Sequence, residues 1–490
     1  GLIHRGMRRK LLESFNETYI LNLHGNSRIG EKCPDGSPDE NVFDIMQGVS
    51  VALFIKDKKQ KGHGKIFYQD VYGLREEKYE YLNKYDVDST KWKKLQPSEH
   101  YYFFVEKDFK LEDNYKKFLS VKNIFMEYNA GTATGKDRVL VDFQKESLAR
   151  KLSVKDKDVF YLLMKAEGIE KKLIDKWYQE LKGSDFKEQI RLYAYRPFDK
   201  RFVIYNERVL QRARKSIMDN MLNENLSIIV TKQLAKLPFN HCFVSTEIGD
   251  RCLISLRTKE LGYFFPLYLY HKKDNPTKKH SLKTFMLLFE PQADYFVRKP
   301  NLSEALIDKL TKTLKKSPIP EQIFFYIYAI LYSNIYRTKY AEFLKIDFPR
   351  IPFAKDNKLF SKMAGYGEKL VDLHLLKSTE LDPPIAKFQG KGDNKVEKPR
   401  YDEKEKWVYF NQSQYFEGIT KEVWQYQIGG YQVCDKWLKD RKGMRLLLED
   451  IKHYCKIITS LQKTIKIQKA IDDIYPNMEK EAIEFEQNGR

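Results

Sequence analysis

The run YILNL (Tyr19–Leu23) decides the fold of the opening part of the chain, together with VSVALFI (Val49–Ile55) and KIFYQDV (Lys65–Val71). Each run is apolar, short and bounded by polar loops, which is the pattern of a strand buried in a sheet. We predict a parallel strand at the first run and a hairpin formed by the other two. A helical pattern at Met7–Phe15 precedes them, so this part is expected to be half of an α/β sheet. Because the chain opens on Gly1 and the other strands are missing, we expect a fragment of a longer protein.

A second module, rich in short strands, is predicted after the loop at Ala130–Asp137. A strand at Val139–Phe143 and helices at Asp156–Glu167 and Ile169–Lys182 open this module. The strands expected next are Leu192–Tyr195, Phe202–Tyr205, Leu226–Thr231, His241–Ser245, Cys252–Leu256 and Phe264–Tyr270. This alternation of helices with short strands and turns predicts an α+β, β-rich domain.

Helical patterns return from Asn301 to Leu376, and Asp382–Lys398 is polar and loop-like. Apolar residues recur every three or four positions from Ile451 to Ile465, which predicts one stripe of a long helix. We expect this helix to pack on its own domain, with a coiled-coil contact to a second subunit as the alternative. The predicted parts are residues 1–130, 131–385 and a helical extension at 386–490.

The composition favours a polyanionic partner. The 490 residues include 88 Lys and Arg against 68 Asp and Glu, a net charge of +20, and aromatic residues make up 14%. Rings at this density suit stacking on bases and a dense core equally well. Five scattered cysteines predict a reducing compartment without zinc, and the longest apolar run, Ile323–Tyr332, is too short to span a membrane. A cytoplasmic protein with no metal site is expected.

Two motifs invite a catalytic interpretation and fail on their details. Gly131–Lys136 (GTATGK) resembles a phosphate-binding loop, but three residues separate the glycines where four are needed, and Asp137 replaces the required Ser or Thr. Asp382–Ile385 (DPPI) resembles the Asp-Pro-Pro-aromatic loop of amino-methyltransferases, but Ile385 cannot stack on a base. We therefore predict no catalytic residue in this chain.

The densest basic stretch, Arg196–Ser216, is the best candidate for contact with nucleic acid. It holds seven basic residues against Asp199 and Glu207, with aromatic residues interleaved. Guanidinium groups suit bidentate contact with phosphates and with guanine edges. The alternative is a solvated basic face whose rings lie in the core. Arg251 would join this surface from a turn, although a structural Asp250–Arg251 contact is an equal alternative.

The individual predictions divide by the part of the DNA that is contacted. Phosphate contacts are predicted for Arg201, Arg208, Arg212 and Arg214. Base-edge contacts are predicted for Arg196, Gln211, Gln233 and Arg251. Further contacts are predicted for Lys200, Lys215 and Lys232.

Several blocks resemble the C-terminal part of type ISP restriction-modification enzymes. Among them are RGMRRKLLESF (Arg5–Phe15), YILNLHGNSR (Tyr19–Arg28), YRPFDKRFVIY (Tyr195–Tyr205), KYAEFLKIDFPRIP (Lys339–Pro352) and IGGYQVCDKWLKDRKG (Ile428–Gly443). Enzymes of this family join a nuclease, a translocase, an adenine-N6 methyltransferase and a target-recognition domain in one polypeptide. The resemblance implies the second half of the methyltransferase, a partial Rossmann-like sheet, followed by the recognition region.

The resemblance also implies a function and its partners. The chain would bind double-stranded DNA, read a short sequence and present one flipped adenine, with Phe43 beside that base unless Phe43 is an ordinary core residue. The parent would use S-adenosylmethionine, but its glycine-rich segment and Asn-Pro-Pro-aromatic loop would lie upstream of Gly1, so we expect no cofactor on this fragment. The alternatives are a scaffold without base specificity, and another kind of enzyme with a nucleotide site around Lys136.

Overall fold

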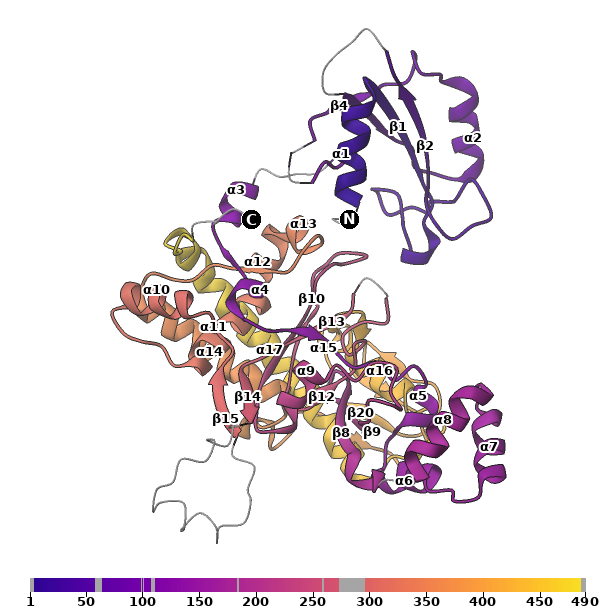
Figure 1. The fold of residues 1–490 in the computed structure, drawn as a ribbon, viewed down its shortest axis with the longest axis vertical. Coiled ribbons are helices and arrows are strands. Elements are labelled where there is room, and N and C mark those ends of the chain that lie inside the picture. Colours follow the sequence, from indigo (N-terminus) through magenta and orange to yellow (C-terminus); the bar gives the residue numbers. More distant parts are fainter. Residues whose placement is uncertain are drawn as a thin grey trace, which may run out of the picture. The chain divides into compact units, whose positions relative to one another are not determined.

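The computed structural model describes residues 4–57, 64–97, 99, 101–106, 111–182, 185–257, 260–272 and 296–485. Its backbone divides into two compact units, Gly1–Glu112 and Asp113–Arg490 (Figure 1). The division comes earlier than residue 130 because strand β6 (Asn129–Ala130) pairs with β13 (Gly262–Pro266) inside the second unit. The assignment of functions to three parts of the chain stays a prediction.

The first unit is a small mixed sheet with one helix before its first strand and a second helix before its last strand. Its elements are α1 (Arg5–Ser14), β1 (Glu17–His24), the 3-10 turn η2 (Ser27–Ile29), β2 (Val49–Ile55), β3 (Lys65–Asp70), α2 (Arg75–Lys84) and β4 (Lys93–Leu95). The strand order is β2-β1-β3-β4. The three apolar runs of the opening sequence are therefore strands, as predicted.

The predicted hairpin between β2 and β3 is wrong, because β1 lies between these two strands. β1 pairs antiparallel with β2 and parallel with β3. Its Leu21 and Leu23 are buried, and β3 buries Ile66 and Tyr68, whereas β2 is exposed over almost its whole length. An inner strand of a sheet is hydrogen-bonded to a neighbour along each of its two edges. β1 and β3, which bury apolar side chains, hold the two inner positions, and the exposed β2 lies at the edge.

The second unit mixes helices with several small sheets. Its first half comprises β5 (Leu119–Ser120), α4 (Val121–Ile124), β6, α5 (Asp137–Leu140), β7 (Val141–Asp142), α6 (Lys145–Leu152), α7 (Lys157–Ala166), α8 (Lys171–Lys182), β8 (Ile190–Arg196), β9 (Asp199–Ile204), α9 (Lys215–Met218), β10 (Ser227–Thr231), β11 (Cys242–Ser245), β12 (Ile248–Gly249), β13 and β14 (Tyr268–Lys272). A short helix, α3 (Glu112–Lys116), spans the division between the units.

The second half of this unit is more helical. It comprises β15 (Phe296–Pro300), α10 (Glu304–Leu314), α11 (Pro320–Tyr332), α12 (Asn334–Lys339), α13 (Ala341–Leu344), β16 (Arg350–Ile351), α14 (Asn357–His374), β17 (Lys387–Gln389), β18 (Arg400–Asp402), β19 (Trp407–Tyr409), β20 (Tyr415–Glu417), α15 (Lys421–Trp424), β21 (Gln427–Ile428), β22 (Tyr431–Gln432), α16 (Val433–Lys439) and α17 (Leu448–Lys480). The four-stranded sheets have the orders β11-β10-β13-β6, β12-β8-β9-β7 and β17-β20-β19-β18.

Of the predicted strands of the second unit, Val139–Phe143 is right only at β7 and Cys252–Leu256 is wrong, both for local reasons. The amides of Val139 and Leu140 both donate to the Lys136 carbonyl, which closes the helical turn α5 before β7 begins. At Cys252 the amide donates to Asp250 Oδ1 at 2.5 Å, so a turn replaces the expected strand. In each case a local hydrogen bond competes successfully with a sheet ladder.

The long helix α17 runs through the second unit beside α11 and α14 (Figure 1). Its stripe of apolar side chains is buried in the unit's own core, as predicted, and includes Tyr454 and Leu461. α11 is buried nearly all round, which explains its apolar sequence. In the part of the chain that the structure describes, no helix is both long and apolar enough to cross a membrane.

A buried ionic cluster joins β9 to α16. The Asp199 carboxylate, whose side chain is 2% exposed, lies 2.8 Å from the guanidinium of Arg201 and 2.8 Å from that of Arg441. Arg441 also stacks on Trp437, with 3.6 Å between the guanidinium carbon and the ring centroid. Asp440 also lies 3.7 Å from Arg201, so two carboxylates face the two guanidinium groups. The cluster is therefore tolerated inside the unit, although burial of a single charge would be costly.

Substitution Asp199→Asn leaves two guanidinium groups without their shared carboxylate. We expect the free energy of unfolding of the second unit to fall by about 3 kcal/mol. Urea unfolding followed by tryptophan fluorescence measures this loss. The matched control is Glu403→Gln, which breaks an exposed pair with Lys421 and should cost less than about 1 kcal/mol. Equal unfolding midpoints for the two variants would contradict the structural role of Asp199.

Candidate nucleic-acid interface

The segment Gly131–Gly135 lies between two stretches that were predicted to form one surface. Ala133 forms a β-bridge with Arg212, and Thr132 forms a bridge with Asp250. The Arg251 amide donates to the Thr132 carbonyl at 2.9 Å. The backbone therefore holds Arg212 and Arg251 on opposite sides of one short segment.

Gly131 is required by this close approach. A Cβ atom at Gly131 would lie 2.6 Å from the backbone nitrogen of Arg251, which is too close for any side chain. Its amide donates to the Gly262 carbonyl at 3.0 Å. Gly131, one of the two glycines of the segment that resembles a phosphate-binding loop, is thus needed for the close packing of two backbone segments.

A buried hydrogen-bond chain anchors the segment from below. The Thr132 hydroxyl donates to the Tyr193 hydroxyl at 2.8 Å, and Tyr193 donates to Asp250 Oδ2 at 3.0 Å. Arg196 lies 3.7 Å from the other oxygen of Asp250. Burial raises the pKa of Asp250, and the Arg196 charge opposes this rise. In this way Asp250 determines the turn that presents Arg251, and Asp250 forms an ion pair with Arg196.

Two of the predicted DNA-binding arginines make internal contacts: Arg196 is buried, and the Arg201 side chain is 13% exposed. The Arg196 side chain is 6% exposed and stacks on Tyr195 at 3.8 Å. Arg201 pairs with Asp199 and stacks on Phe143 at 4.1 Å. Both guanidinium groups stabilise the fold in this conformation, and contact of either with DNA stays a prediction.

Three more predicted cations are exposed but paired. Lys200, Arg208 and Lys215 each lie beside a carboxylate at the surface. The partners are Glu247, Glu180 and Asp219, at 3.1, 3.1 and 3.0 Å respectively. Surface pairs of this kind are weak, so a phosphate can replace the carboxylate at little cost.

The remaining six predicted residues carry side chains that are available to a ligand. In the described ranges of the chain, none of the six forms an ion pair or a side-chain hydrogen bond with a described residue. They are Gln211, Arg212, Arg214, Lys232, Gln233 and Arg251. Arg212 and Gln211 are exposed, and the other four are half-buried. We call Arg212, Arg214, Lys232 and Arg251 the open cations.

Two half-exposed tyrosines beside the open cations were missed from the sequence. The Tyr263 ring on β13 lies 6.2 Å from the Tyr128 ring, and the Arg214 charge acts on the Tyr263 hydroxyl. Lys232 lies over the nearby Phe348 ring at 5.9 Å. β13 brings Tyr263 beside β6, a pairing that residue spacing could not predict. The one signal in the sequence that could have pointed to Tyr263 was its hydroxyl-bearing ring in an otherwise apolar, buried strand.

Phe43 lies in the loop that follows β1 in the first unit. Its side chain is 58% exposed, so it is not a core residue of this unit. Its amide donates to Asn41 Oδ1 at 2.9 Å, and the Asn41 side-chain amide donates to the Gly25 carbonyl at 3.1 Å. The buried Asn41 therefore holds the backbone that presents the Phe43 ring.

This loop begins where the parallel strands β1 and β3 end, at His24 and Asp70. Ligands of open α/β sheets bind at the carboxyl ends of the strands. A fully buried ion pair, Lys78 with Asp39 at 2.7 Å, ties the loop to the unit. The Lys78 ammonium also donates to the Leu23 carbonyl at 2.7 Å, at the end of β1.

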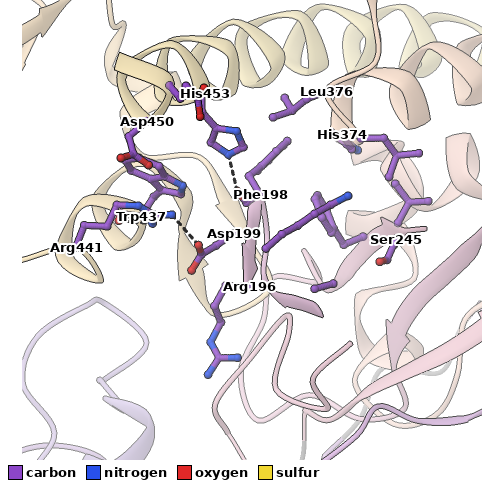
Figure 2. Close-up of a pocket in the computed structure, with 16 residues that line it drawn as sticks. Arg196, Phe198, Asp199, Ser245, His374, Leu376, Trp437, Arg441, Asp450 and His453 are labelled. Carbon is purple, nitrogen blue, oxygen red and sulfur yellow. Dashed lines mark hydrogen bonds and ion pairs between the residues drawn. The ribbon is translucent and has the colours of Figure 1, made fainter. Parts of the chain in front are cut away.

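A cavity of about 400 Å³ in the second unit is a separate feature (Figure 2). Its polar wall is occupied by internal contacts: Arg441 pairs with Asp199, and His453 Nε2 donates to the Phe198 carbonyl at 2.8 Å. Burial lowers the pKa of His453, which favours the neutral ring. Of the predicted DNA-binding residues, only Arg196 and Lys200 are among the described residues that line it. The described residues contain no group of three or more His, Cys, Asp or Glu placed to hold a metal ion.

Comparison with known proteins matches most of the chain to one family. The family model of the Type ISP C-terminal specificity domain matches residues 123–470. A comparison with curated proteins finds no match.

Solved structures similar to this chain include "ATP-dependent Type ISP restriction-modification enzyme LlaBIII bound to DNA" (21% identity, TM-score 0.73) and "cryoEM structure DrdV-DNA complex" (20%, 0.70). A third is a nuclease-deletion mutant of the Type ISP restriction-modification enzyme LlaGI in complex with a DNA substrate mimic (18%, 0.66). Each match covers 95% of this chain but only 31%, 48% and 37% of the respective solved chain. At these identities the likeness concerns the fold, whereas the family model spans most of the chain. The chain therefore belongs to the family of Type ISP C-terminal specificity domains.

Proposed function

We propose that the second unit binds double-stranded DNA and recognises a short target sequence for a site-specific adenine-N6 methyltransferase of the restriction-modification class. The observation that carries this proposal is the backbone pairing of Gly131–Gly135 with Arg212 on one side and with the Asp250–Arg251 turn on the other, inside the region matched by the specificity-domain family. The three similar solved structures are complexes with DNA or a DNA substrate mimic, which supports the same partner.

The open side chains divide naturally between the two kinds of DNA contact. Arg212 is exposed and Arg214 half-exposed, so they suit phosphates, which position a protein on the duplex. Arg251 is held by the Asp250 turn and can form a bidentate contact with guanine. Gln211 and Gln233 carry amides of the kind that pair with adenine in the major groove. These five residues are the proposed recognition set.

A scaffold that binds DNA without base specificity is the second candidate. The net charge of +20 alone would support that behaviour. The glutamines among the recognition set favour sequence reading, because amides add little to the attraction of a polyanion.

The first unit is proposed to complete a methyltransferase sheet together with a part of the parent outside this chain. β2 supports this proposal: it lies at the edge of the sheet, and its Val51 and Leu53 are 50% and 43% exposed. An apolar edge strand left open is an aggregation hazard that proteins normally cover. A further strand of the methyltransferase is the proposed cover.

In the complete enzyme, Phe43 is proposed to lie against the flipped adenine. The exposed ring at the carboxyl edge of β1 supports this role, because extruded bases stack on aromatic side chains. S-adenosylmethionine would be held by the part of the parent outside this chain. The parent is proposed to work in the bacterial cytoplasm.

The salt dependence of DNA binding tests the proposed interface. Replacing the open cations Arg212, Arg214 and Lys232 together by Gln should reduce the slope of log affinity against log salt by about 2 to 3 units, since each cation that contacts a phosphate contributes about 0.9. Fluorescence anisotropy with a labelled duplex at several salt concentrations measures the slope.

The control variant replaces Lys309, Lys312 and Lys316, on and just after α10, by Gln. It removes the same charge and should change the slope by less than about 1 unit. Equal slopes for the two triple variants would contradict the interface. An affinity that is unchanged across many duplex sequences would favour the scaffold.

Lysine on the open strand tests the proposed cover of β2. The substitutions Val51→Lys and Leu53→Lys should change the free energy of unfolding by less than about 0.5 kcal/mol, because both positions are exposed in this chain. The same variant should fail to co-purify with the methyltransferase part of the parent when the two pieces are expressed together. Normal co-purification of the double variant would mean that β2 is not the junction.

A further inference from the structure

His24, at the end of β1, is held by carboxylates on both sides of its ring. Its Nδ1 lies 2.9 Å from Glu31 Oε1, and its Nε2 lies 2.6 Å from Asp70 Oδ1. The side chain is only 10% exposed. An ionised carboxylate can only accept hydrogen bonds, so both ring nitrogens must carry a proton. The geometry therefore describes an imidazolium ion.

The surroundings of His24 agree with a positive charge. The Tyr72 ring stacks on the imidazole with 3.8 Å between centroids and 17° between planes, an arrangement that favours a cation. The Asn22 amide also lies 3.0 Å from Nε2, but the shorter contact with Asp70 still requires a proton on that nitrogen. Asp70 is itself held by the Tyr68 hydroxyl at 2.5 Å.

Three parts of the first unit meet at this ring. His24 ends β1, Asp70 ends β3, and Glu31 belongs to the loop Gly25–Gly48. Glu31 Oε2 accepts the Asn26 amide at 2.9 Å, so the carboxylate that holds His24 also shapes the loop. The loop then returns to Gly25 through Asn41, which holds the backbone of Phe43.

We propose that His24 is a positioning residue: as an imidazolium it locks the loop Gly25–Gly48 to β3, and so sets the place of the Phe43 ring. This inference rests on the proposed function for the role of Phe43, but the lock itself belongs to the free chain. It makes the order of the loop depend on pH near neutrality.

The direction of the pH dependence follows from the groups that face His24. Burial lowers the pKa of His24, but the hydrogen bonds to Asp70 and Glu31 outweigh burial and raise it above 6.5. Burial opposes ionisation of Asp70, but its hydrogen bonds with His24 and Tyr68 lower its pKa. Burial raises the pKa of Tyr68, and it raises the pKa of Tyr72 to about 12. Neither tyrosine ionises near neutrality. The lock is therefore complete below about pH 6.5 and is lost as the pH rises through the folded pKa of His24.

Hydrogen–deuterium exchange of loop peptides between pH 6 and pH 9, corrected for intrinsic rates, tests the proposal on the full chain without DNA. We expect exchange in the loop to increase about tenfold across one single-proton transition with its midpoint above 6.5. Glu31→Gln removes one carboxylate and should lower that midpoint by about one unit. His24→Gln should remove the transition and leave the loop fast at every pH. His453→Gln, a buried histidine in the second unit, should leave the transition unchanged.

A loop whose corrected exchange is independent of pH would overturn the proposal, and so would a midpoint that Glu31→Gln does not move. If His24 were merely structural, His24→Gln would destabilise the unit, but the midpoint of the exchange transition would not shift when Glu31 is replaced by Gln. Failure of the role of Phe43 is distinguished separately: Phe43→Ala would then leave methylation by the complete enzyme unchanged, while the transition in the loop persists.

Discussion

The buried carboxylate of Asp250 is the constraint on which the candidate interface depends. It accepts hydrogen bonds from Tyr193 and from the Cys252 amide, and it compensates the charge of the buried Arg196. These contacts form the turn that carries Arg251 and support the segment Gly131–Gly135. The surface cations are thus placed by a polar network in the interior, where a carboxylate is costly unless each oxygen is satisfied.

The distribution of charge explains why a net charge of +20 does not by itself define an interface. Within the basic stretch, Arg201 forms an ion pair with Asp199, and Arg208 forms one with Glu180. Arg212 and Arg214, a few residues farther on, have no such carboxylate in the described structure. The capacity to bind a polyanion therefore lies with a minority of the basic residues. These are the ones that the backbone does not place beside a carboxylate.

Much of the fold could be predicted from local patterns, and the failures have physical causes. Apolar runs identified β1, β2 and β3, but the order of strands depends on which of them buries its side chains. The stripe on α17 was predicted correctly because its period is a property of the helix alone. Cys252 was misassigned because the hydrogen bond from its amide to Asp250 is invisible in a strand pattern.

The candidate site was predictable only in part, for a related reason. Basic residues can be counted in a sequence, but their partners cannot: Arg201 belongs to a cluster with Arg441, far away along the chain. Tyr263 escaped notice because its neighbour on the surface is brought by the pairing of β13 with β6. Phe43 was singled out by family resemblance, and its exposure could be learned only from the structure.

Photo-crosslinking to duplex DNA tests the central claim most directly. A benzophenone amino acid would be placed at position 211 beside Arg212, at position 263 on β13, and at the exposed position 448 at the start of α17. The account predicts crosslinks from positions 211 and 263 and none from 448. Crosslinks from 448, with none from the other two positions, would contradict the account.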